Sequence, residues 1–291
     1  MRFRSLSPLR YPGGKSRLAD YLARLVSSQS PRPREYAEPF AGGAGAALRL
    51  LANEEVRHAH INDLDPGIAA FWRSLFTSTE DFSQLILSVA LSIDEWHRMR
   101  DIYANPTQYD DLELGFATFY LNRTNRSGIL RARPIGGLEQ TGNWKIDARF
   151  NRDDLADKVR YVGEYRNRVT VTELDARDFL LKMERHTSDV LVYVDPPYLV
   201  QGERLYLDGL SYDDHTQLAA QLRTVDLPWF MTYDADERIP NELYAGLRCA
   251  SFDIAHTAAT QHIGSEYAVF AEGITVPDLE IIRGNTARWI A

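Results

Sequence analysis

Residues 190–198 read Val-Leu-Val-Tyr-Val-Asp-Pro-Pro-Tyr. The apolar, β-branched start predicts a buried strand that ends just before Asp195. Pro196 and Pro197 cannot donate to a sheet ladder, and each proline biases the residue before it towards extended geometry. The sequence therefore predicts a rigid corner at the carboxyl end of a buried strand, the edge at which open α/β sheets bind ligands.

The residues of this corner suggest a chemistry. The carboxylate of Asp195 and the carbonyl of Pro196 can both accept hydrogen bonds from one amino group. The ring of Tyr198 offers a face on which a planar base can stack. We therefore interpret Asp195, Pro196, Pro197 and Tyr198 as a catalytic corner for an exocyclic amine of a nucleobase; the alternative is a strand-ending turn with a capping aspartate.

Composition sets the class of protein. The chain has 291 residues, of which 44% are hydrophobic and 25% are charged, as in ordinary globular domains. It has no apolar stretch of about 18 residues, and its first ten residues lack the apolar core of a signal peptide. Cys249 is the one cysteine, which excludes an internal disulfide. These features predict a cytoplasmic protein with no membrane partner.

The net charge of −8 is unevenly distributed. Residues 121–170 carry 11 basic and 6 acidic side chains, whereas residues 171–291 carry 9 basic and 20 acidic ones. A local basic segment is the electrostatic signature of phosphate contact. The acidic remainder is typical of a solvated surface and does not argue against a nucleic acid partner.

Apolar runs of strand type alternate with helical patterns. We expect strands at residues 35–40, 58–63, 168–173, 189–194 and 227–233, and a terminal hairpin at 248–255 and 266–272. We expect helices at 46–51 and 214–223. Strands separated by helices predict an α/β fold with a mainly parallel sheet.

Residues 72–155 break this alternation. Apolar residues such as Trp72, Leu75, Trp96 and Met99 follow helical spacing, and a glycine-rich, loop-like stretch runs from 123 to 145. We therefore expect two parts: residues 1–71 and 156–291 as the sheet domain, and residues 72–155 as a helical insertion.

A glycine loop follows the first expected strand. Residues 38–45 read Glu-Pro-Phe-Ala-Gly-Gly-Ala-Gly, and such loops let the backbone approach a ligand at a helix N-terminus. Asp63 follows at the end of the next strand, from which a carboxylate can reach ribose hydroxyls. This pairing indicates a nucleotide-like or adenosyl ligand; the alternative is a helix-packing turn with a capping aspartate.

Residues 11–17 read Tyr-Pro-Gly-Gly-Lys-Ser-Arg and contain the Gly-Lys-Ser end of a phosphate-binding loop. That motif requires a glycine at position 9, which is leucine, and a preceding strand, so we reject it. The segment still offers the cation of Lys15 and the ring of Tyr11, which suit a ligand with a carboxylate and an aliphatic chain.

The basic segment contains Asn122, Arg123, Arg126, Arg131 and Arg133 among hydrogen-bonding neighbours. Arginines bind phosphates and read guanine edges, so we expect these residues to contact DNA; the alternative is a solvated loop. The histidines at 58, 60, 215 and 256 show no spacing of metal ligands along the chain, and we expect no metal.

In order along the chain, these segments resemble the Dam-type (D12 class, alpha-group) family of DNA adenine N6-methyltransferases. The matching pieces are Tyr11-Pro-Gly-Gly-Lys15, Glu38-Pro-Phe-Ala-Gly42, Ile61-Asn-Asp63, Phe119-Tyr-Leu-Asn-Arg123 and Asp195-Pro-Pro-Tyr198. The ordered set is specific, although each single piece is short. The resemblance implies a class I methyltransferase-like, Rossmann-like fold with a seven-stranded sheet and an inserted helical DNA-recognition domain.

The resemblance also implies S-adenosyl-L-methionine as cofactor, double-stranded DNA as partner and an adenine turned out of the helix. Asp178 and Phe179 resemble the pair that holds the cofactor adenine. The cofactor residues implied at matching positions are Tyr11, Lys15, Glu38, Phe40, Gly42, Asp63, Asp178, Phe179 and Asp195.

Several departures leave the recognition sequence open. The glycine loop reads Gly42-Gly43-Ala44 rather than alternating glycines, and Arg126 stands where GATC-methylating members carry an aromatic residue. The alternatives are a methyltransferase of RNA or of a protein amide, and a non-catalytic DNA-binding subunit. Housekeeping, restriction-modification and phage-defence roles, the last two with a cognate partner, also stay open.

Overall fold

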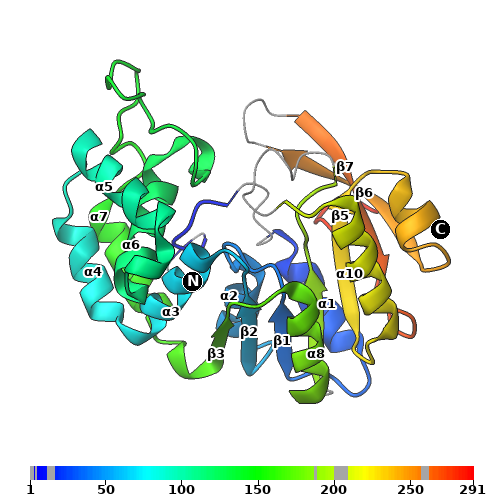
Figure 1. Cartoon of the computed structure of the whole chain (residues 1–291). Helices are drawn as coiled ribbons and strands as arrows, with labels where there is room; N and C mark the ends of the chain where they lie inside the picture. Colours follow the sequence, from blue (N-terminus) through cyan, green and yellow to red (C-terminus); the bar gives the residue numbers. More distant parts are fainter. Residues whose placement is uncertain (1–2, 4, 12–16, 187–188, 200–208, 257–261) are drawn as a thin grey trace. The chain divides into compact units, whose positions relative to one another are not determined.

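The computed structural model describes residues 3, 5–11, 17–186, 189–199, 209–256 and 262–291 (Figure 1). The chain forms two compact units. The helical unit comprises Met1–Gly14 and Asp65–Val171, and the sheet unit comprises Lys15–Leu64 and Thr172–Ala291. The helical unit thus begins before and ends after the predicted insertion, 72–155, and it also includes the first residues of the chain.

The helical unit contains five α-helices and short 3₁₀ turns among its described residues. Asp65 caps the first helix by accepting from the backbone of Gly67 and Ile68, with Pro66 at the first helical position. Asp110 and Glu113 form a capping box at the start of the helix Asp111–Thr124. The elements are α3 (Pro66–Thr77), α4 (Thr79–Ser88), α5 (Ile93–Ala104), η2 (Pro106–Gln108), α6 (Asp111–Thr124), η3 (Arg126–Gly128), α7 (Arg152–Gly163) and η4 (Arg166–Arg168).

Helix packing explains where the helical unit begins and ends. The ring of Phe71 on α3 lies 5.6 Å from Phe82 and 6.0 Å from Phe119, measured between ring centroids, so all of α3 shares the helical core. A Cβ at Gly115 would lie 2.6 Å from the Ala70 carbonyl oxygen, which shows how closely α6 approaches α3. Because α7 packs on α4, the unit also extends beyond residue 155.

The sheet has the order β3-β2-β1-β4-β5-β7-β6-β8. The pairs of β1 with β2, β1 with β4 and β4 with β5 are parallel, and β5, β7, β6 and β8 pair in antiparallel fashion. The strands are β1 (Glu35–Glu38), β2 (His58–Asn62), β3 (Val169–Thr172), β4 (Val190–Val194), β5 (Trp229–Asp234), β6 (Cys249–His256), β7 (His262–Phe270) and β8 (Arg288–Trp289). The predicted α/β fold with a mainly parallel sheet is confirmed, with β8 as an eighth, two-residue strand beyond the predicted seven.

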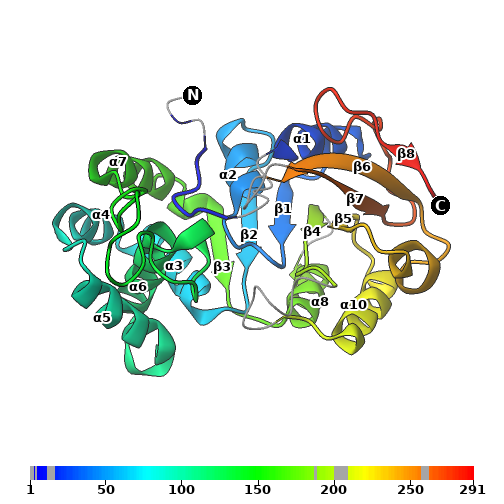
Figure 2. The same ribbon diagram turned by 90° about the horizontal axis from the view of Figure 1, so that it is seen from above.

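Helices cover both faces of this sheet. Figure 2 shows α1 (Ala19–Ser28) and α2 (Gly45–Ala52) on one face, and α8 (Ala176–His186) and α10 (Tyr212–Thr224) on the other. Every residue of β4 is buried, as expected for a central parallel strand. The strand order reverses between β1 and β4, and the carboxyl ends of these two strands form the topological switch point at which such sheets bind ligands.

No helix in the described part of the chain is long and apolar enough to cross a membrane. Cys249 is buried on β6, and burial raises the pKa of its thiol to about 12. The thiol is therefore protonated and unreactive at neutral pH. The π-helical turn η5 (Ile239–Leu243) lies on the path between β5 and β6.

Candidate active site

The Asp195 corner is held by the neighbouring strand. Val194 pairs with Met231 of β5, so the next residues along the two strands, Asp195 and Thr232, meet at the sheet edge. The Thr232 hydroxyl donates to Asp195 Oδ1 at 3.1 Å, and its Oγ1 lies 2.7 Å from the Tyr193 hydroxyl. Because Thr232 has one hydroxyl proton and gives it to the carboxylate, Tyr193 must donate to Thr232. A directional chain of hydrogen bonds therefore fixes the Asp195 carboxylate.

The other end of the corner is held by acids from β5 and β7. The Tyr198 hydroxyl donates to Oε1 of the buried Glu266 at 2.7 Å, and the backbone N–H of Leu199 donates to Asp234 Oδ1 at 3.3 Å. Burial raises the pKa of Asp234. Tyr198 is half-buried, so one part of the ring stays accessible while its hydroxyl is fixed. Glu266 and Thr232 carry no motif in the sequence, which is why sequence reasoning missed them.

Glu38 lies at the end of β1, next to the corner in the sheet order. Its Oε1 accepts from the Tyr36 hydroxyl at 2.9 Å and from the Ala47 backbone at 3.0 Å. Burial, reinforced by the nearby charge of Asp195, raises the pKa of Glu38 to about 8 despite these hydrogen bonds. Glu38 is therefore mostly protonated at neutral pH, and Phe40 beyond it is half-buried.

The raised pKa of Glu38 predicts a pH effect on stability. The unfolded chain loses this proton at its ordinary pKa of 4.5, whereas the folded chain keeps it up to about 8. The contribution of Glu38 to the free energy of unfolding therefore falls as pH rises through this window, by up to about 1.4 kcal/mol per pH unit. We expect Glu38→Gln, which keeps the two acceptor contacts, to gain stability relative to the wild type between these pH values.

Chemical denaturation of the wild type and of Glu38→Gln across this pH range measures the difference between their free energies of unfolding. Subtracting one free energy from the other cancels the contributions of the other titrating groups. A difference that stays flat would contradict the protonated state of Glu38.

Asp63 holds the glycine loop. The Gly42 backbone N–H donates to Asp63 Oδ2 at 2.8 Å, and Gly42 has a φ of +46°, which favours glycine. The buried Asn62 side chain links the same edge by donating to the carbonyls of Pro39 and Leu174, at 3.0 and 2.9 Å. Asp63 is half-buried, and its carboxylate holds the loop at the edge of the sheet where the sequence predicts a ribose.

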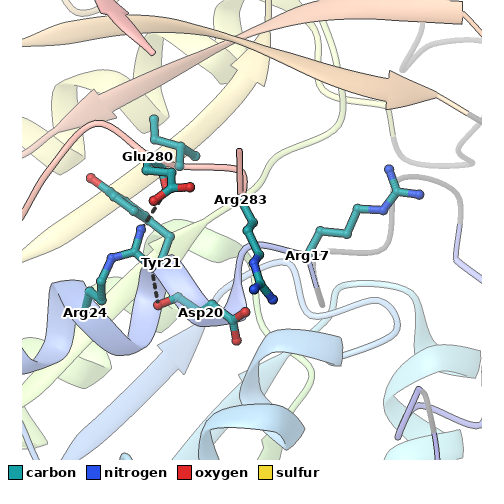
Figure 3. A pocket seen from close by; sticks show the side chains of 7 residues that line it. Arg17, Asp20, Tyr21, Arg24, Glu280 and Arg283 are labelled. Carbon is teal, nitrogen blue, oxygen red and sulfur yellow. Dashed lines mark hydrogen bonds between the residues drawn. The ribbon is translucent and has the colours of Figure 1, made fainter. Parts of the chain in front are cut away.

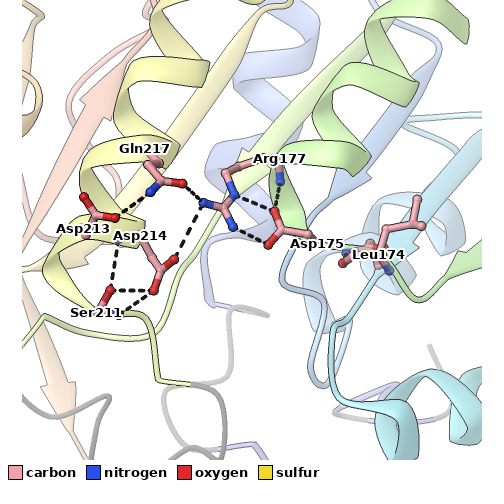
Figure 4. Close-up of polar contacts among 8 residues, drawn as sticks. Leu174, Asp175, Arg177, Ser211, Asp213, Asp214 and Gln217 are labelled. Carbon is pink, nitrogen blue, oxygen red and sulfur yellow. Dashed lines mark hydrogen bonds and ion pairs between the residues drawn. The ribbon is translucent and has the colours of Figure 1, made fainter.

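Asp178 and Phe179 lie in the first turn of α8. Asp178 is exposed, whereas the Phe179 ring is fully buried in the core, so only the backbone of Phe179 can meet a ligand at this edge. Beside them, Arg177 pairs with Asp175 at 2.8 Å and with Asp214 at 3.7 Å, which fixes the start of α8 against α10 (Figure 4). The Arg177 guanidinium lowers the pKa of Asp175.

Of the two cofactor residues predicted near the N-terminus, one belongs to the helical unit and the other lies outside the described residues. Tyr11 is half-buried, and Lys15 lies outside the described residues. The segment before Tyr11 is fixed by Asn122, whose side chain accepts from the Arg10 N–H at 2.7 Å and donates to the Arg10 carbonyl at 2.9 Å.

Asn122 is fully buried, and its amide also donates to the Gly128 carbonyl. These contacts give Asn122 a structural role, and its contact with DNA stays a prediction. Arg123 is half-buried and donates to the backbone carbonyls of Arg149 and Pro8. Burial, reinforced by Arg10, lowers the pKa of Arg123 to about 10, so it stays charged at neutral pH.

The other three predicted arginines, Arg126, Arg131 and Arg133, are exposed on one loop. Asn125 fixes this loop by donating to the carbonyls of Ile129 and Leu130, while its Oδ1 accepts from Trp96 Nε1 at 2.6 Å. The loop therefore presents cations on a fixed backbone. Further along, the Trp144 side chain is 73% exposed.

A hollow of about 210 Å³ lies elsewhere in the sheet unit, between α1 and the C-terminal segment (Figure 3). One of its lining cations, Arg24, is already bound to both carboxylate oxygens of Asp278 and to the Glu280 carbonyl. None of the predicted catalytic or cofactor residues that the structure describes lines it. The lining residues are Arg17, Asp20, Tyr21, Arg24, Glu280, Ile281 and Arg283.

Comparisons with known proteins identify the family to which the chain is similar. Residues 11–263 match the family model described as D12 class N6 adenine-specific DNA methyltransferase. The chain is 22% identical over 203 residues to the type II methyltransferase M.MjaIII of Methanocaldococcus jannaschii, covering 65% of this chain and 68% of that protein. It is 23% identical over 218 residues to the retron Ec67 DNA adenine methylase of Escherichia coli, covering 74% and 71%.

Among solved structures, the rRNA methyltransferase aviRa of Streptomyces viridochromogenes aligns with a TM-score of 0.39 and 17% identity, covering 90% of this chain and 86% of that one. This likeness is too low to carry an argument. The sheet order itself supports the Rossmann-like assignment, because the reversal between β1 and β4 is the arrangement of doubly wound α/β sheets.

Proposed function

Because the chain belongs to the D12 class of N6 adenine-specific DNA methyltransferases, we propose that it transfers a methyl group from S-adenosyl-L-methionine to a flipped adenine at a specific DNA site. The observation that carries this proposal is the Asp195 corner, whose carboxylate is oriented by Thr232 and whose tyrosine is held by Glu266. The two relatives named as methyltransferase and adenine methylase support it.

The polar groups at the carboxyl edge of the sheet are of the kinds that can bind an adenosyl cofactor. It combines the backbone of a glycine loop, the Asp63 carboxylate after β2 and the exposed Asp178 on α8. Asp63 would accept from the ribose hydroxyls, and Asp178 with the Phe179 backbone would hold the adenine. When bound, the cofactor supplies an electrophilic methyl group on a sulfonium.

The corner residues act on the target amine. The adenine N6 lone pair is delocalised into the ring and is a poor nucleophile. Asp195 and the Pro196 carbonyl accept hydrogen bonds from its two N–H groups, which localises the lone pair for direct transfer. The methyl group replaces one N6 proton, which is released to solvent. Pro197 keeps the corner rigid, so positioning and electrostatics supply the catalysis without a covalent enzyme intermediate. Stacking on Tyr198 offsets the cost of unstacking the base, a few kcal/mol.

The helical unit is proposed to read DNA through the loop of Arg126, Arg131 and Arg133. Because the loop backbone is already held in place, binding does not have to order it, and the exposed arginines can reach phosphates or guanine edges. The net positive charge of residues 121–170 supports this role in an otherwise acidic chain.

Incubation of the purified chain with labelled S-adenosyl-L-methionine and genomic DNA tests the function. Sequencing that detects N6-methyladenine should find modification at one short sequence. Labelling of RNA or protein in place of DNA, or no labelling of DNA, would overturn the proposal.

Asp63 provides a test of the cofactor site. We expect Asp63→Ala to weaken S-adenosyl-L-methionine binding about 10- to 100-fold, because hydrogen bonds to a charged group contribute about 1.5–3 kcal/mol. Asp63→Asn retains an acceptor for the Gly42 N–H and should lose less affinity. Calorimetric titration with the cofactor alone measures both. An unchanged dissociation constant in Asp63→Ala would return Asp63 to a purely structural role.

A further inference from the structure

A second cluster of ligating side chains lies in the sheet unit, at the edge opposite to the Asp195 corner. Glu35 is the first residue of β1, His60 lies on the parallel neighbour β2, and His186 is the last residue of α8. One ligating atom from each of the three lies within 4.8 Å of the others. Three separate elements therefore converge on one point.

The geometry of the cluster is close to that of a coordination shell. His60 Nε2 lies 2.7 Å and His186 Nε2 lies 3.7 Å from the same atom, Glu35 Oε2. With metal–ligand lengths of about 2.0–2.2 Å, ligands of a tetrahedral zinc ion lie roughly 3.4 Å apart. The two separations from Glu35 Oε2 lie on either side of that value, and all three ligating atoms lie within 4.8 Å of one another, so shifts of about 1 Å would be needed to admit an ion between them.

The burial of the three side chains suits a site that forms without rearrangement of the fold. The His60 side chain is 6% exposed and fixed in the sheet, whereas that of His186 is 53% exposed at a helix end. The buried ring supplies a rigid ligand, and the exposed one leaves an entry path. His58 lies on the same strand, and its ring centroid is 4.8 Å from that of His60.

We propose that Glu35, His60 and His186 form a Zn²⁺ site. Two imidazoles and one carboxylate are a donor set that zinc favours, with the remaining position open to water. An ion there would tie β1, β2 and α8 together at the edge remote from the predicted chemistry, so its effect is on stability. Lys182, one turn earlier on α8, acts electrostatically on His60 and opposes a cation, which makes the negative charge of Glu35 essential.

The spacing of histidines along the chain predicts no metal site, because Glu35 and His186 are far from His60 in the sequence. Only the fold brings the three side chains together. The inference is independent of the proposed methyl transfer, since none of the three residues lies at the carboxyl edge of the sheet.

Calorimetric titration of the full, untagged, chelator-treated chain with ZnCl₂ tests the site. We expect one equivalent to bind and to raise the melting temperature. His186→Ala and Glu35→Gln should each weaken binding by at least about tenfold, the lower end of the effects known for metal-site substitutions. The matched control is His97→Ala, an exposed histidine of the helical unit, which should leave the affinity unchanged.

Absence of saturable zinc binding would overturn the proposal. So would binding that His186→Ala and Glu35→Gln leave intact, or that His97→Ala weakens equally. If Glu35→Gln fails to fold, His186→Ala still decides, because its side chain lies at the exposed end of α8.

Discussion

We expect Asp195→Ala to lower the rate of methyl transfer by about 10²–10³-fold while DNA binding is retained. The lost carboxylate is a preorganised acceptor for the target amine, and removing such a group typically costs about 2.7–4 kcal/mol of transition-state stabilisation. Thr232→Val should give a smaller loss, because it removes the donor that orients Asp195 but leaves the carboxylate in place. Single-turnover kinetics with saturating cofactor and DNA measure both variants.

Asp213→Ala is the matched control, because this aspartate is exposed on α10 and should leave the rate unchanged. A near wild-type rate for Asp195→Ala would refute the assignment of Asp195. A Thr232→Val variant as inactive as Asp195→Ala would instead indicate a direct role for the threonine.

Arg131→Ala is expected to relax the preference at one base pair by about 1–3 kcal/mol, as for loss of an arginine that reads a guanine edge. Arg126→Ala and Arg133→Ala, if they contact phosphates, should weaken binding to all sequences and reduce the salt dependence by about one unit of slope each. Sequencing of methylated sites and DNA titrations at several salt concentrations separate the two behaviours.

Arg123→Ala serves as a comparison, because its guanidinium already binds the backbone carbonyls of Arg149 and Pro8. We expect this change to lower the melting temperature more than it changes site preference. If Arg126, Arg131 and Arg133 can all be replaced with wild-type site preference and salt slope, the recognition surface lies elsewhere, with the exposed Trp144 as the next residue to test.

The sequence predicted the elements whose signals are local. The strand at 189–194 became β4, Val190–Val194, because an apolar run followed by two prolines fixes both its start and its end. The helices expected at 46–51 and 214–223 became α2 and α10, since the apolar periodicity of both and the capping box of α10 act over a few residues. The switch point follows from strand order, and it brings Glu38 and Asp195 to neighbouring strand ends.

The contacts that hold the site were decided only by the tertiary structure. Thr232 and Glu266 reach the Asp195 corner from strands that come later in the chain, and no short motif marks them. Likewise, the boundary of the helical unit follows from the packing of α3 against α6, whereas the pattern of aromatic residues suggested a start inside α3.

Tertiary packing also decides which residues of the basic segment are buried and which are exposed, and it creates the histidine cluster. Asn122 and Arg126 look alike as polar residues in a basic stretch, yet one is fully buried and the other exposed. His60 gains Glu35 and His186 as neighbours because β1, β2 and α8 meet at one edge of the sheet. Local sequence fixes backbone preferences over a few residues, but burial and proximity of distant side chains depend on how whole elements pack.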